Sequence, residues 1–104
     1  MRQLRQGDVL LVRVAARPAG GRKVAREDGR IVLALGEVTG HAHVIDAPAV
    51  ELYETADGVR YLDVTAPAAV VHEEHAAVDL EPGVYEVRLQ REYAPAARPR
   101  RVAD

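Results

Sequence analysis

All four histidines of the chain fall in two short motifs, Gly40-His41-Ala42-His43 and His72-Glu73-Glu74-His75. Residues i and i+2 of a strand project from the same face, so His41 and His43 can direct their imidazoles to one point. His72 and His75 are three positions apart, a spacing that converges in a tight turn or in a single helical turn. We therefore predict that folding brings the two pairs together in one site.

Neutral imidazole is a common ligand of divalent transition metals. We predict that His41, His43, His72 and His75 bind a metal ion, with zinc as the first choice and iron, nickel or copper as alternatives. Glu73 or Glu74 would orient a ligand or act as general base to a metal-bound water, whose pKa zinc can lower to about 7. Two other interpretations stay open: histidines that only hydrogen-bond turn backbone or face solvent, and a metal-free acid–base pair.

The composition limits the kinds of chemistry that the chain can perform. A length of 104 residues allows one domain, and the chain contains no serine and no cysteine. The commonest covalent nucleophiles, disulfides and thiolate metal sites are therefore excluded. Phenylalanine and tryptophan are also absent and tyrosine occurs four times, so Val, Leu, Ile and Ala must fill the core.

Charge and hydropathy indicate the compartment and the partners. The net charge of −2 argues against a general nucleic-acid binder, although an Arg-rich loop over residues 16–30 and an Arg-rich tail could contact an anion. No apolar run approaches the roughly 20 residues that cross a bilayer, and the N-terminus has no apolar signal-peptide region. We therefore predict a cytoplasmic protein that does not associate with membranes.

Short β-branched and alternating segments predict strands along most of the chain, and no segment has the apolar stripe of a helix. The predicted strands cover residues 9–14, 31–35, 41–45, 50–54, 59–64, 68–71, 76–81 and 84–93. Asp57-Gly58 is typical of a type I′ hairpin turn. The fold class is all-β, a small single-domain barrel or sandwich of about seven to eight short antiparallel strands over residues 1–93, followed by a Pro- and Arg-rich tail over 94–104.

Four segments carry a resemblance to known proteins. The segments at residues 5–10, 36–43, 72–75 and 90–93, which include the G-H-x-H, H-x-x-H and Q-R-E-Y motifs, resemble a group of short uncharacterised bacterial and phage proteins. More faintly, Gly36 and His41-Ala42-His43 are similar to the metal-binding motif of small cupins. In this chain the next glutamate is Glu51, and Pro82-Gly83 follows the second histidine pair. The cupin resemblance implies a β-barrel that holds a metal.

Two functions of different classes follow from these observations. The first is a small cytoplasmic metal-binding β protein with a histidine site, for which an enzymatic role and a small-molecule ligand stay open. The alternative is a non-catalytic module that forms homo-oligomers or binds a partner, because a core of small side chains gains stability from assembly.

Overall fold

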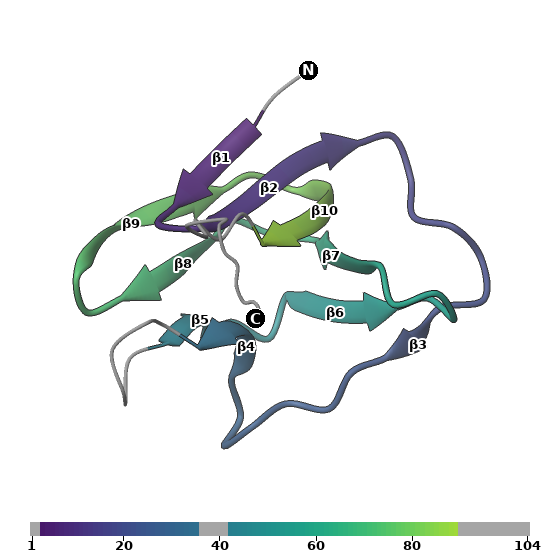
Figure 1. Ribbon diagram of the computed structural model, residues 1–104, viewed down its shortest axis with the longest axis horizontal. Helices are drawn as coiled ribbons and strands as arrows, with labels where there is room; N and C mark the ends of the chain where they lie inside the picture. The colour runs from purple at the N-terminus through teal and green to yellow at the C-terminus, as the bar shows by residue number, and fades with distance from the viewer. Residues whose placement is uncertain (1–2, 36–41, 90–104) are drawn as a thin grey trace, which may run out of the picture.

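The computed structural model describes residues 3–35 and 42–89 and places ten strands in them (Figure 1). The strands are β1 (Gln3–Gln6), β2 (Val9–Val14), β3 (Arg22–Lys23), β4 (Ile31–Leu35), β5 (Ala42–Ile45), β6 (Val50–Glu54), β7 (Arg60–Val64), β8 (Ala68–His72), β9 (His75–Leu80) and β10 (Gly83–Leu89). These residues contain no helix, and hence none that could span a membrane. The all-β prediction is confirmed.

The strands form two antiparallel sheets. One sheet has six strands in the order β1-β2-β10-β7-β6-β3, and the other has four in the order β4-β5-β8-β9. Strand β2 pairs with β10, so the beginning and the end of the described chain lie next to each other. Strand β1 of the first sheet also contacts β9 of the second (Figure 1), and this junction between the sheets positions the candidate site.

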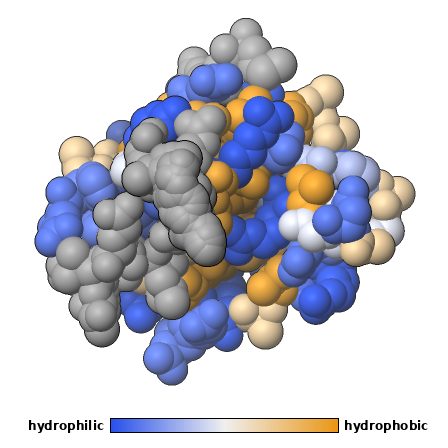
Figure 2. Space-filling view, viewed as in Figure 1, coloured by the Kyte–Doolittle hydropathy of each residue, from blue (hydrophilic) through white to orange (hydrophobic). Residues whose placement is uncertain are grey.

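One aliphatic core joins the two sheets. Its members are contributed by strands of both sheets and are all aliphatic apart from one tyrosine: Val9, Leu11, Ile31, Leu33, Ala34, Ile45, Val50, Leu52, Leu62, Val64, Val70, Leu80, Tyr85 and Val87. The absence of phenylalanine and tryptophan thus predicts the character of the core. On the face that Figure 2 shows, hydrophilic residues surround apolar residues that lie towards the middle.

Two strands were not expected from the sequence. Strand β1 has the polar sequence QLRQ, which lacks the alternation of a half-buried strand, and pairing with β2 makes it extended. Strand β3 is a two-residue segment inside the predicted 16–30 loop, where it pairs with the end of β6. The end of the predicted strand 84–93 and the tail 94–104 extend beyond the described residues.

The β6–β7 hairpin is confirmed, but its turn differs from the predicted type. A type I′ turn needs positive φ at both central residues. Here Gly58 has φ +89, whereas Asp28 is the only non-glycine residue with positive φ in the described part of the chain. The Gly58 N–H donates to the Thr55 carbonyl at 2.9 Å, so the turn spans Thr55–Gly58 and a longer loop joins the strands.

An arginine side chain forms a hydrogen bond between the two sheets. The Arg60 Nη2 on β7 donates to the Leu33 carbonyl on β4 at 2.6 Å, where the β4–β5 register shifts. Hydrogen bonds of charged groups contribute more than neutral ones, so we expect Arg60→Met to lower the free energy of unfolding by about 1.5–3 kcal/mol. Arg88→Met is the matched control, because Arg88 is exposed and contacts Glu86 on its own strand. Urea denaturation measures both, and equal midpoints for the two variants would contradict this role.

Candidate functional site

Three histidines gather at the junction of the two sheets. The ring centroids are 4.4 Å apart for His43 and His72, 4.7 Å for His72 and His75, and 5.9 Å for His43 and His75. His43 and His72 are only 2% and 7% exposed, whereas His75 is exposed to solvent. The cluster therefore has a buried side and an open side.

Local strand geometry explains this grouping. His72 pairs with His75 across a two-residue turn formed by Glu73 and Glu74, as the H-x-x-H spacing predicts. Strand β5 runs antiparallel to β8 with Val44 opposite Val71, and side chains alternate between the faces of a sheet. His43 and His72, each next to one of these valines, consequently lie on the inner face.

The β1–β2 turn completes the cluster and was not recognised from the sequence as part of a site. Gln6 pairs with Val9, which leaves Gly7 and Asp8 as a two-residue hairpin turn with Gly7 at φ +59. A Cβ atom on Gly7 would lie 2.8 Å from His75 Nε2 and 3.3 Å from His43 Cε1. The turn backbone thus packs directly against two imidazoles.

Gln6 is buried, with 4% of its surface exposed, and its amide connects three strands. Its Nε2 donates to the carbonyls of Val70 on β8 and Ala76 on β9, both at 2.9 Å. Its Oε1 therefore faces His43 Nδ1, also at 2.9 Å. An amide oxygen can only accept, so His43 Nδ1 carries a proton and, in the neutral ring, the lone pair is on Nε2.

A carboxylate lies next to that lone pair. Asp8 Oδ1 is 3.7 Å from His43 Nε2, and the Asp8 side chain is 16% exposed. This separation exceeds the 2.7–3.2 Å or so of a hydrogen bond. Asp8 was read from the sequence only as a turn residue, because Gly-Asp before an apolar strand is an ordinary turn signal.

His72 has the opposite arrangement of proton and lone pair. Its Nδ1 accepts the backbone N–H of Glu74 at 3.0 Å, so the neutral ring carries its proton on Nε2. Glu74 thus contacts the cluster through its backbone. The side chains of Glu73 and Glu74, the predicted catalytic residues, are exposed in the turn.

The structure does not present a completed metal centre. Within residues 3–35 and 42–89, no three histidine or carboxylate side chains have their donor atoms gathered around one point. The His43 and His75 rings lie nearly parallel, with an interplanar angle of 17°, rather than both pointing to one position. The fourth predicted ligand, His41, lies outside the described residues.

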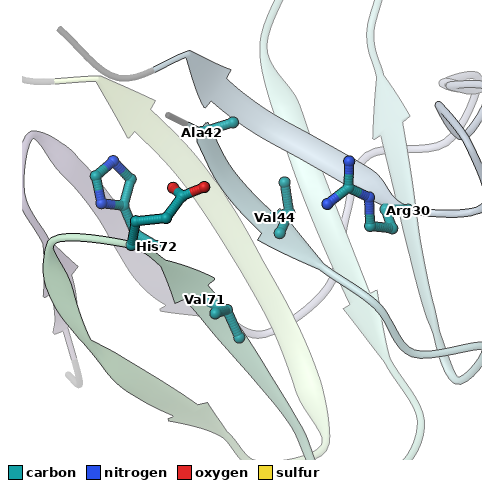
Figure 3. Close-up of a pocket in the computed structure, with 6 residues that line it drawn as sticks. Arg30, Ala42, Val44, Val71 and His72 are labelled. Carbon is teal, nitrogen blue, oxygen red and sulfur yellow. The ribbon is translucent and has the colours of Figure 1, made fainter. Parts of the chain in front are cut away.

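An open groove of about 270 Å³ is lined by residues of the four-stranded sheet and its neighbouring turns. Figure 3 shows Val44 of β5 and Val71 of β8 near its middle, with the Arg30 guanidinium on one side and the His72 imidazole on the other. Val71 is 49% exposed. Glu73 also lines the groove, so the lining combines a carboxylate, the Arg30 guanidinium and aliphatic side chains.

The comparisons with known proteins identify a family. No curated protein and no solved structure shows significant similarity to the chain. Residues 5–90 match the family described as a domain of unknown function, DUF8820, and this range includes the β1–β2 turn and all three clustered histidines. The predicted resemblance to an uncharacterised family is thereby confirmed, and the chain belongs to the DUF8820 family.

Proposed function

We propose that this protein binds one divalent transition metal ion at the junction of its sheets, with His43, His75 and Asp8 as ligands. The observation that carries the proposal is the position of the buried His43 Nε2 beside the Asp8 carboxylate, with His43 Nδ1 held by Gln6. His41 stays a predicted additional ligand, two residues before His43 in the chain.

The environment of His43 supports this role. Histidines that bind metals usually donate their other ring N–H to a carbonyl or carboxylate, which fixes the ring and raises the basicity of the donor nitrogen. The bond from His43 Nδ1 to the Gln6 amide oxygen has this form.

The distance between Asp8 and His43 also supports an ion between them. Zinc ligands lie about 2.0–2.2 Å from the ion, so two ligands at a tetrahedral angle are about 3.3–3.6 Å apart. The 3.7 Å between Asp8 Oδ1 and His43 Nε2 is close to this range. A small movement of either side chain would allow both atoms to contact one ion.

His75 can supply the third ligand atom. Its Nε2 lies against Gly7, the neighbour of Asp8 in the β1–β2 turn, and its ring is exposed. Two imidazoles and one carboxylate suit zinc, as in His₂Glu hydrolases, and also iron(II). Such a set leaves a position for water, for which Glu73 or Glu74 stays the predicted base.

His72 has a different role in this proposal. Its Nδ1 accepts the Glu74 amide, and its Nε2 is protonated in the neutral ring, so neither nitrogen offers a lone pair in this conformation. We therefore assign His72 as a hydrogen-bond donor beside the ion and not as a ligand. Of the four histidines predicted as ligands, the proposal keeps His41, His43 and His75.

The test is metal content and affinity of the purified chain. We expect about one zinc or iron per chain by mass spectrometry and, after chelation, rebinding of zinc by calorimetry. His43→Ala and Asp8→Asn should each weaken zinc binding by at least about 100-fold, since loss even of an orienting partner costs about 10–100-fold. His72→Gln should retain most of the affinity, and Glu73→Gln is the surface control. Wild-type protein that binds no metal after supplementation would overturn the proposal.

A further inference from the structure

The Gln6 amide has a single orientation that satisfies its surroundings. Two backbone carbonyls, of Val70 and Ala76, approach one end of the amide at 2.9 Å each, and a carbonyl can only accept. That end must be the NH₂ group, which leaves the oxygen for His43. The orientation therefore follows from the β8 and β9 backbone, independently of any property of the histidines.

From this we propose that Gln6 is a positioning residue that sets the tautomer of His43, so that His43 and His72 are held in opposite tautomers. His43 has its proton on Nδ1 and its lone pair on Nε2, whereas the Glu74 amide holds the proton of His72 on Nε2. The two rings are 4.4 Å apart. In the site, His43 Nε2 is therefore a hydrogen-bond acceptor and His72 Nε2 is a hydrogen-bond donor.

This inference deepens the proposed function, because the Nε2 lone pair of His43 is the one offered to the ion. Imidazole must be oriented and in the correct tautomer before a metal can bind to a given nitrogen. Gln6 performs both tasks with one side chain, because the bonds to Val70 and Ala76 fix its own position. The His43 ring is then oriented before the ion arrives.

Long-range ¹H–¹⁵N correlation spectra of the metal-free, ¹⁵N-labelled wild type test the tautomers directly. The prediction concerns the neutral rings, so the spectra are recorded at alkaline pH. We expect His43 to show a protonated Nδ1 and an unprotonated Nε2, and His72 to show the reverse. A protonated Nε2 on neutral His43 would overturn the inference.

Variants at Gln6 separate positioning from a purely structural role. Gln6→Met removes the acceptor, and we expect the Nδ1–H signature of His43 to be lost and zinc affinity to fall by about 10–100-fold. Gln3→Met is the matched control, because Gln3 is an exposed glutamine on the same strand. Retention of the signature in Gln6→Met would contradict the inference.

The two proposals fail in distinguishable ways. Opposite tautomers in a chain that binds no zinc would leave the inference intact and remove the metal function. If the chain binds zinc but its neutral His43 carries the proton on Nε2, the metal function stands and the inference about Gln6 fails. The wild-type spectrum decides the tautomers even where a Gln6 variant does not fold.

Discussion

Gly7→Ala should both destabilise the protein and weaken its binding of metal. Gly7 has φ +59, a conformation that costs a residue with a side chain about 1–3 kcal/mol. The new methyl group would also lie 2.8 Å from His75 Nε2, which forces the exposed ring of His75 to move. Under the proposed function that movement removes a ligand, so zinc affinity should fall by at least about 10–100-fold.

Gly58→Ala provides the matched control for this experiment. Gly58 has φ +89, so an alanine there is strained in a similar way, but its Cβ would have no atom within 4 Å. We expect Gly58→Ala to lower the free energy of unfolding and leave zinc affinity unchanged. Urea denaturation and zinc calorimetry on both variants separate the two effects. Wild-type zinc affinity in Gly7→Ala would show that His75 is not a ligand.

Tyr85→Ala should cause the largest loss of stability. Tyr85 on β10 is the largest fully buried side chain in the described chain, with 0% of its surface exposed. It is also the only aromatic residue of an otherwise aliphatic core. Truncation of a large buried aromatic side chain to alanine costs about 3–5 kcal/mol, because the surrounding side chains fill the cavity only in part. Native domains are stable by about 5–15 kcal/mol, so this variant should be near the limit of folding.

Tyr85→Phe separates the contribution of the ring from that of the hydroxyl. The Tyr85 hydroxyl donates to the Glu81 carbonyl at 2.7 Å, and removing this one bond should cost about 1 kcal/mol. Urea denaturation of the wild type and both variants gives the contributions of the ring and of the hydroxyl to the free energy of unfolding. A loss below about 1 kcal/mol in Tyr85→Ala would show that the core tolerates the cavity and that β10 is not central to it.

The sequence predicted those parts of the fold that depend on short-range patterns. The strands on either side of Gly58 have β-branched and alternating residues, and they occur as expected. Strand β1 has no such pattern, since its extended form depends on pairing with β2. In β9 the predicted alternation holds at Leu80, which is buried, but Ala76 at the beginning of this edge strand is exposed.

The candidate site was predictable to the same extent. The turn between His72 and His75 follows from their spacing, and His43 follows from its strand. Gln6 could not be found in this way, because its partners Val70 and Ala76 are 64 and 70 positions away. Contacts of this kind arise only when the sheets pack together, and they leave no local signal in the sequence.

Gln6 is far in the sequence from its partners Val70 and Ala76, so the site can form only late in the synthesis of the domain. During synthesis the β1–β2 hairpin leaves the ribosome before β8 and β9, so Gln6 lacks its two carbonyl partners until Ala76 has been added. Strand β2 further lacks its second neighbour until β10 is complete. Under the proposed function, loading with metal is therefore a step that follows translation of the domain, and a nascent or truncated chain that ends before β10 should not compete for the ion.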